Sequence, residues 1–350
     1  EEGPGIAAII ILVGVVTVLT YFFYSIEHKG PVKWAVALGI YFLMVSFGTS
    51  FGLTVMGRVS LLIGRCDDLI MYAEGRYFYA TPILLDLLRQ EEATGTFFFV
   101  GEAARQHPET VRQVMKAGHE VGCHSLYHET VGQALFPIPG MTPLLPHEVR
   151  PRLELATRLV REAAGGQDMV SFRCPRLFGG SEAVAALEDL GYLADASFPM
   201  YHYPERTTPY HPDRNDWTRP GNLRLLEFPN FADVTIESKD PYGRDRDQWP
   251  LFRTKSAKSL LTHVDAFIGH VRARRQPAVL TFYFHPWEFW PMPRGPIHYG
   301  EGAVLPDPFL VQNCGSYACD QFALLLRELR QRGGRFSTCT AYARQHGVSG

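Results

Sequence analysis

Two long uncharged segments at the start of the chain limit how it can fold. Residues 3–26 and 34–57 each run for 24 residues without a charged side chain and are rich in Val, Leu and Phe. Each is longer than the roughly 20 helical residues that cross a lipid bilayer. The chain has 34 Lys and Arg and 36 Asp and Glu residues, yet only six of them fall in residues 1–64. We therefore predict a transmembrane helical hairpin over residues 1–57, with helices at about 5–26 and 34–57.

The loop between the two apolar segments predicts an orientation. It carries Lys29 and Lys33, whereas Glu1 and Glu2 flank the first segment. Positively charged loops stay in the cytoplasm, which puts the rest of the chain on the outer face of a bacterial inner membrane. A signal peptide or a buried core helix is the alternative for one such segment, but no small-residue cleavage site follows the first one.

The remaining residues, 58–350, have the composition of a globular domain. The net charge of the chain is −2, and 20% of its residues are charged. A nucleic-acid-binding protein usually carries a basic face, so this balance argues against nucleic acid as a partner. Six cysteines are too few for a disulfide-built scaffold. A disulfide between Cys314 and Cys319 is an open alternative for a domain outside the cytoplasm.

Short apolar runs alternate with helical patterns along this domain. Strands are expected at 59–63, 96–100, 120–123, 170–173, 193–196, 225–228 and 279–284, and helices at 81–91, 108–117, 146–164, 181–190, 257–274 and 317–331. Strands that alternate with helices form a parallel sheet, and a count near seven favours a closed (β/α) barrel. Residues 200–250 read as a long surface excursion.

Polar side chains follow several of these strands, where barrel enzymes carry their chemistry. His124 and His128 follow one strand, and a four-residue spacing on a helical turn places both rings on one face. Asp67 and Asp68 follow the first strand, where one carboxylate can bind a metal while its neighbour accepts a proton from metal-bound water. His285 follows the last strand and is a candidate general acid. Surface histidines, a solvated turn and a core histidine are the respective alternatives.

Together these segments resemble the polysaccharide deacetylases of carbohydrate esterase family 4, the NodB-homology domain. The resemblance spans about residues 59–346. It is carried by Thr-Pro-Ile-Leu-Leu-Asp at 81–86, Gly-Thr-Phe-Phe-Phe-Val-Gly at 95–101, His-Pro-Glu at 107–109 and Gly-His-Glu-Val-Gly-Cys-His-Ser-Leu-Tyr-His at 118–128. It implies a distorted (β/α) barrel of seven or eight strands. Segments 195–199, 226–229 and 285–288 are most similar to the branch found in bacterial exopolysaccharide gene clusters.

The resemblance implies a metal centre and a catalytic base. Asp68, His124 and His128 would hold a divalent metal, with zinc expected first and cobalt, nickel, manganese or iron(II) as alternatives. Asp67 would be the base. The usual first motif, Thr-Phe-Asp-Asp-Gly, reads Arg-Cys-Asp-Asp-Leu at 65–69, so the division of roles between the two aspartates stays open.

Further roles follow from the same resemblance. Arg173, in an Arg-x-Pro motif with Pro175, would pair with the base, and Asp195 would line and support the site. His285 would protonate the departing amine. Aromatic rings suit the apolar faces of sugars, and Tyr127 and Trp287 are the candidates for substrate contacts, with Trp290 beside them.

These residues predict a hydrolase of linear amide bonds that removes N-acetyl groups from an N-acetylated glycan or a lipid-linked amino sugar. Two alternatives remain. One is a deformylase or other amide hydrolase acting on a non-polymeric substrate. The other is an inactive family member that binds glycan or acts as a scaffold in a membrane assembly, although such a protein should lack one of the six catalytic and metal-binding residues.

Overall fold

The structure, a computed structural model, describes residues 6–22, 29–45, 80–138, 141–292, 295, 297–299, 302–304 and 307–348. The chain divides into two units, Glu1–Leu69 and Ile70–Gly350. The predicted domain boundary at 57/58 and the predicted strand at 59–63 lie outside the described residues.

The first unit contains two helices that pack closely. Helix α1 (Ile6–Phe22) is followed by a helix over residues 31–45. A Cβ atom on Gly39 would lie 2.3 Å from the backbone oxygen of Thr17, and one on Gly14 would lie 2.9 Å from the Phe42 ring. Glycine at these two positions therefore lets the helix backbones approach each other.

The membrane-spanning hairpin predicted for residues 1–57 is not supported. Helix α1 has 17 residues, fewer than the roughly 20 that span a bilayer. In the described segments, no helix combines the length and the apolar character that crossing a membrane requires.

The second unit is built around a parallel sheet whose strand order follows the chain, β1-β2-β3-β4-β5. The strands are β1 (Thr96–Phe99), β2 (Glu120–Cys123), β3 (Ser171–Phe172), β4 (Ala194–Pro199) and β5 (Leu226–Asn230). Each pairs in parallel with the next, and a single parallel bridge from Asn230 to Thr281 continues the order. This confirms the predicted α/β class with a parallel sheet. Closure into a seven- or eight-stranded barrel stays a prediction.

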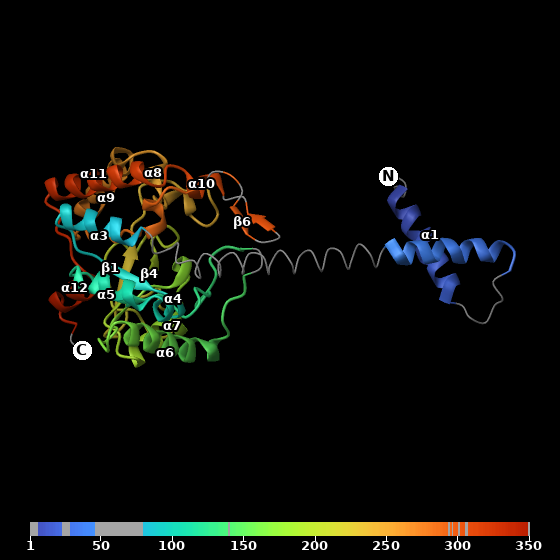
Figure 1. The fold of residues 1–350 in the computed structure, drawn as a ribbon, viewed down its shortest axis with the longest axis horizontal. Helices are drawn as coiled ribbons and strands as arrows, with labels where there is room; N and C mark the ends of the chain where they lie inside the picture. The colour runs from blue at the N-terminus through green and yellow to red at the C-terminus, as the bar shows by residue number, and fades with distance from the viewer. Residues whose placement is uncertain are drawn as a thin grey trace. The chain divides into compact units, whose positions relative to one another are not determined.

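Helices cover the sheet in two groups, which lie above and below it in Figure 1. One group is α4 (Gly101–Gln106), α5 (Pro108–Lys116), α6 (Pro146–Ala163) and α7 (Ser181–Asp189). The other is α3 (Thr81–Gln90), α8 (Leu251–Thr254), α9 (Ala257–Ala273) and α11 (Ser316–Gln331). Helix α12 (Cys339–Gln345) contacts β4. The unit also contains the short helix α10 (Pro308–Val311). A two-stranded hairpin is formed by β6 (Ile297–Tyr299) and β7 (Gly302–Val304).

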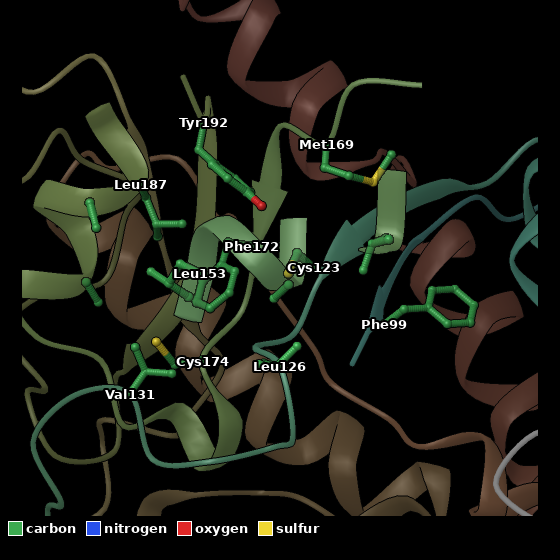
Figure 2. Packing of buried hydrophobic residues seen from close by; sticks show 14 of the residues in the cluster. Phe99, Cys123, Leu126, Val131, Leu153, Met169, Phe172, Cys174, Leu187 and Tyr192 are labelled. Atoms are coloured by element: carbon green, nitrogen blue, oxygen red, sulfur yellow. The ribbon is translucent and has the colours of Figure 1, made fainter. Parts of the chain in front are cut away.

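Two buried clusters hold these layers together. One contains Phe172, Leu153 and Tyr192, which lie between the sheet and α6 and α7 (Figure 2). The other contains Phe252, Phe267 and further side chains from α3, α8, α9 and α11. Apolar burial of this extent is the dominant favourable contribution to folding.

The six predicted helices are confirmed, each within one residue at either end. Proline in the first turn marks the start of α3, α5 and α6, where its missing N–H costs no hydrogen bond. Thr81 is the first helical residue of α3 and not its cap, since Ala80 holds the cap position.

Two other expectations are wrong in the described residues. Residues 279–284 form one bridge rather than a strand. The segment 200–250 is not a simple surface excursion, because Tyr210 and Trp217 are buried in the first cluster. Their rings pack edge-on against Phe198 of β4, so the segment folds back onto the sheet.

The packing of the core predicts that two leucines of the α6 region contribute very differently to the free energy of unfolding. Leu153 is 1% exposed, whereas Leu145, at the N-cap, is 56% exposed. Leu153→Ala should lower the free energy of unfolding by about 2–5 kcal/mol, because it removes buried methyl groups and leaves a cavity. Leu145→Ala should change it by less than about 0.5 kcal/mol. Urea denaturation of both variants would test this, and equal losses would contradict the packing.

Candidate active site

The polar residues predicted for the site lie mainly at the carboxyl ends of the strands. His124 follows β2, Arg173 follows β3, and His285 follows the segment that bridges β5. Parallel strands bring these ends to one edge of the sheet, where α/β proteins bind ligands. Asp67 and Asp68 lie outside the described residues.

The segment from His124 to His128 is a bend and not the helical turn that the spacing suggested. Ser125 and His128 have positive φ angles of 65° and 60°, which are uncommon for residues with a side chain. Glu129 stabilises this bend, because its Oε2 accepts hydrogen bonds from Ser125 Oγ at 3.0 Å and from the Tyr127 N–H at 2.6 Å. The bend still brings the His124 and His128 rings together, with centroids 5.0 Å apart.

Both imidazoles are in the protonation state that a metal ligand needs. Burial lowers the pKa of His124 to about 3 and lowers that of His128 well below its usual range, so both rings are neutral at pH 7. His124 Nδ1 lies 2.7 Å from the backbone oxygen of Arg173. A neutral ring that donates from Nδ1 to this oxygen leaves the Nε2 lone pair available to a metal.

A divalent cation fits this pair, which supplies two neutral nitrogen donors of the kind found in catalytic zinc sites. The predicted third ligand, Asp68, lies outside the described residues, and within the described part of the chain no cluster of three His, Cys, Asp or Glu side chains could hold a metal. The two histidines are therefore two of the three predicted ligands of a candidate metal centre.

Arg173 is held at the sheet edge by contacts to neighbouring strands. Its Nε donates to the Ala196 oxygen at 2.9 Å and its Nη2 to Asn230 Oδ1 at 2.8 Å. The guanidinium carbon lies 4.8 Å from the centre of the Phe98 ring. Such a guanidinium can orient a neighbouring carboxylate, the role predicted for it beside Asp67.

Asp195 is fully buried below the site rather than exposed at its surface. One carboxyl oxygen, Oδ1, accepts a hydrogen bond from Ser197 Oγ. Across the sheet its partner in register is Glu227, whose Oε1 accepts from the N–H groups of Ser197 and Phe198 at 3.1 and 2.9 Å. The other oxygens, Asp195 Oδ2 and Glu227 Oε2, are buried without a hydrogen-bond partner, and a proton held between the two carboxyls would satisfy both.

Pro175 is also buried and begins a short 3₁₀ helix, η2 (Pro175–Leu177). The next residue, Arg176, donates from Nη1 to the backbone oxygen of His128 at 3.0 Å. The Arg-x-Pro segment therefore contacts the histidine bend directly.

His285 lies among aromatic side chains. Its ring stacks on Trp287 with centroids 5.3 Å apart and meets Trp249 edge-on at 5.1 Å. The side chain is 42% exposed, so one edge of the ring faces solvent. Burial is the main cause of the lowered pKa values of His124 and His128, and a positive charge at His285 lowers them further. Tyr127 is 57% exposed and Trp290 is 42% exposed.

Three residues of this site were not predicted, namely Asn230, Trp249 and Asp247. Asn230 binds the Arg173 guanidinium, and its position as the last residue of β5 was the available signal. Trp249 and Asp247 come from the segment expected to be a surface excursion. Asp247 Oδ2 accepts from the Tyr283 hydroxyl at 2.6 Å, and burial raises the pKa of Asp247 to about 6.

A cavity of about 830 Å³ lies elsewhere, lined by residues that precede β2, β3 and β4, among them His119, Val170 and Leu193. It contains none of the predicted site residues. We assign the chemistry to the opposite ends of the strands, because the histidines, Arg173 and His285 gather there.

Comparison with known proteins identifies the family. The sequence pattern described as polysaccharide deacetylase matches residues 75–194. The peptidoglycan-N-acetylglucosamine deacetylase of Bacillus cereus is 30% identical over 173 residues, which are 48% of this chain and 69% of that protein. The chain belongs to the polysaccharide deacetylase family. This membership confirms the predicted enzyme class, an amide hydrolase of the deacetylase type, while the exopolysaccharide branch is not confirmed.

Another curated relative and a solved structure also resemble this chain. A chitooligosaccharide deacetylase of a Bradyrhizobium species is 26% identical over 157 residues, 45% of this chain and 61% of that protein. The chain thus spans less than two thirds of the length of that relative. The crystal structure of the allantoinase Puue has a TM-score of 0.52 and 14% identity, covers 79% of this chain and 74% of its own, and shows the fold alone.

The cysteines of this deacetylase are free where the structure describes them. Cys314 and Cys319 are not joined, so the disulfide considered for them is absent from this structure. Cys123 and Cys174 are buried next to site residues, as expected for small apolar side chains.

The buried pair Asp195 and Glu227 predicts a pH dependence of stability. Burial raises the pKa of both carboxyls, and repulsion from Asp195 raises that of Glu227 further. In the unfolded chain both ionise near pH 4. Above about pH 4 the unfolded state has therefore released protons that the folded state keeps, and the free energy of unfolding falls as pH rises until the folded pair has ionised too.

Glu227→Gln should make this decline shallower by up to about 1.4 kcal/mol per pH unit, because it removes one of the coupled acids. Urea denaturation between pH 5 and 8 would measure it. Glu182→Gln, at an exposed position on α7, is the matched control and should leave the slope unchanged. Equal slopes for wild type and Glu227→Gln would contradict the shared-proton arrangement.

Proposed function

We propose that the protein removes N-acetyl groups from an N-acetylated glycan or lipid-linked amino sugar in a metal-dependent hydrolysis. One observation carries this proposal: two neutral imidazoles, His124 and His128, lie 5.0 Å apart at the carboxyl edge of the sheet. Arg173 contacts the first of them through its backbone oxygen. The peptidoglycan and chitooligosaccharide deacetylases among its relatives support the substrate class.

His124 and His128, with Asp68 as the predicted third ligand, would hold the divalent cation, zinc by preference. When bound there, the cation supplies Lewis-acid chemistry, which polarises the acetyl carbonyl and makes a water molecule more acidic. His124 is oriented for this role by its Nδ1 contact with the Arg173 oxygen at 2.7 Å.

The remaining steps are proton transfers by side chains of this chain. Asp67 would accept a proton from the attacking water, whose oxygen adds to the acetyl carbon. Arg173 would keep that carboxylate ionised and oriented. His285 would donate a proton to the nitrogen as the C–N bond breaks, which releases acetate and a free amino sugar. The aromatic rings of Trp287 and Trp249 beside His285 suit the apolar face of a sugar.

The alternatives are less well supported. The relatives named above are glycan deacetylases, which does not favour a deformylase of small substrates or an inactive scaffold. A location outside the cytoplasm, in a bacterial inner membrane, stays a prediction from the positions of Lys29 and Lys33. It is consistent with peptidoglycan as a substrate class.

The metal-dependent activity can be tested with the full chain on chitooligosaccharides and peptidoglycan fragments. The wild type should release acetate and free amine, and a chelator should abolish the release until zinc is restored. His124→Ala and His128→Ala should each lower the rate at least about 100-fold, because each removes a nitrogen donor. His147→Ala, at an exposed position, is the control and should retain the rate.

No release from any N-acylated sugar by metal-loaded wild type would overturn the proposed function. Release that survives both chelation and His124→Ala would leave a hydrolase but overturn its metal dependence.

A second experiment separates the two aspartates. Asp67→Asn should keep the bound metal and lose turnover by about 100-fold or more, as expected for a general base. Asp68→Asn should lose metal as well as turnover. Metal content by elemental analysis, measured with the acetate assay, would decide, and the reverse pattern would mean that the two roles are exchanged.

A further inference from the structure

A buried ion pair lies directly behind His285. Arg253 of α8 and Glu288 of the short helix η4 (Pro286–Phe289) are both fully buried, and Arg253 Nε donates to Glu288 Oε2 at 2.6 Å. Arg253 Nη1 also donates to the backbone oxygen of Gln312 at 2.7 Å. Transferring two charges from water into the interior costs several kcal/mol per ion, so a buried pair is weak evidence for a purely stabilising role.

The second oxygen of this carboxylate faces His285. Glu288 Oε1 accepts from the His285 backbone N–H at 2.8 Å and lies 3.2 Å from His285 Nδ1. It also accepts from Trp249 Nε1 at 2.9 Å. Arg253 thus occupies one oxygen of the carboxylate, while the other is directed at the histidine ring and its aromatic neighbour.

Glu288 is ionised at neutral pH. Burial alone would raise the pKa of its carboxyl group, but the hydrogen bond and charge of His285, together with the charge of Arg253, hold that pKa below its usual range. A carboxylate beside Nδ1 selects the tautomer that carries its proton on Nδ1, and it stabilises the ring when Nε2 is protonated too.

We propose that Glu288 is the positioning residue of His285 and that Arg253 locks Glu288 in place. Glu288 holds Nδ1–H inward, so Nε2 points to the exposed side, and it keeps the imidazolium available to protonate the departing amine. This proposal rests on the proposed role of His285 as general acid. Asp195 does not take this role, since it is hydrogen-bonded to Ser197 and Glu227.

Other groups around His285 do not supply this interaction. Trp249 and Trp287 contact its ring through their aromatic faces and edges. The Tyr283 hydroxyl donates to Asp247. His124 and His128 are neutral and Arg253 is positive. Among the described residues, Glu288 is the carboxylate within hydrogen-bonding range of the His285 ring, with Oε1 3.2 Å from Nδ1.

The test compares variants on two substrates that differ in their need for an acid. The amine of a chitooligosaccharide needs a proton to depart, whereas 4-nitrophenyl acetate releases a phenolate that does not. Glu288→Gln removes the charge but leaves Arg253 unpaired, which threatens folding. The double variant Arg253→Met with Glu288→Gln removes both charges and avoids this. Glu91→Gln, in the partly buried pair with Arg327 between α3 and α11, is the matched control.

We expect the double variant to lose about 10- to 100-fold in kcat for the amide, part of the contribution of general acid catalysis, with KM unchanged. The alkaline limb of its pH–rate profile should move to lower pH, and its rate on the aryl ester should be retained. Glu91→Gln should match the wild type in all three. Equal losses on amide and ester would show a merely structural role and overturn the proposal.

A measurement without turnover separates this proposal from the proposed function. In the ¹⁵N NMR spectrum of the full chain, neutral His285 should carry its proton on Nδ1, and its titration midpoint should fall in the double variant. A proton on Nε2, or an unchanged midpoint, overturns the role of Glu288 even if the enzyme is active. Wild type that hydrolyses no N-acylated sugar but shows both NMR signatures overturns the proposed function instead. If the double variant does not fold, the role of Glu288 is tested by the His285 tautomer alone. That tautomer is then compared between the wild type and Glu288→Asp, which keeps the charge on a shorter side chain.

Discussion

Arg173 makes hydrogen bonds to several of the strand ends that carry the candidate active site. Its backbone N–H donates to the Cys123 oxygen of β2 at 3.1 Å, and its guanidinium binds Ala196 of β4 and Asn230 of β5. The same guanidinium lies over the Phe98 ring of β1. Because one side chain satisfies acceptors on several strands, a displacement of any strand would leave a buried polar group without its partner. The site therefore has the rigidity of the sheet, although most of its residues are in loops.

Four buried acidic side chains surround this edge, and they are stabilised in three different ways. Burial raises the pKa of both Asp195 and Glu227, so this pair keeps a proton to a higher pH than two exposed carboxyls would. Asp247 accepts a hydrogen bond from Tyr283. Glu288 is paired with Arg253 and stays ionised. Glu288 thus places an ionised carboxylate directly behind His285, where its charge favours a protonated acid.

Much of the fold could be predicted because its signals are local. Proline in the first turn and apolar side chains at helical spacing marked α3, α5 and α6, and short apolar runs marked β1 to β5. The predictions failed where contacts with residues distant in the sequence determine the local conformation. Residues 279–284 have the pattern of a strand but form one bridge, and the bend at His124–His128 depends on Glu129 and the Arg173 oxygen. The membrane hairpin was predicted from the length of the apolar segments. The helices that the structure describes are not both long and apolar enough to cross a membrane.

The sequence by itself determined the α/β class, the family and the identity of the histidines, Arg173 and His285, because residue type and order along strands are local properties. Only the tertiary structure decided how these side chains are held. In the tertiary structure, His124 lies within hydrogen-bonding distance of the Arg173 oxygen, and Asp195 is buried beside Glu227. Trp249 and Arg253, from the 200–254 region, donate hydrogen bonds to Glu288 behind His285. These contacts join residues far apart in the chain. Their geometry follows from packing of the whole unit, which no local pattern records.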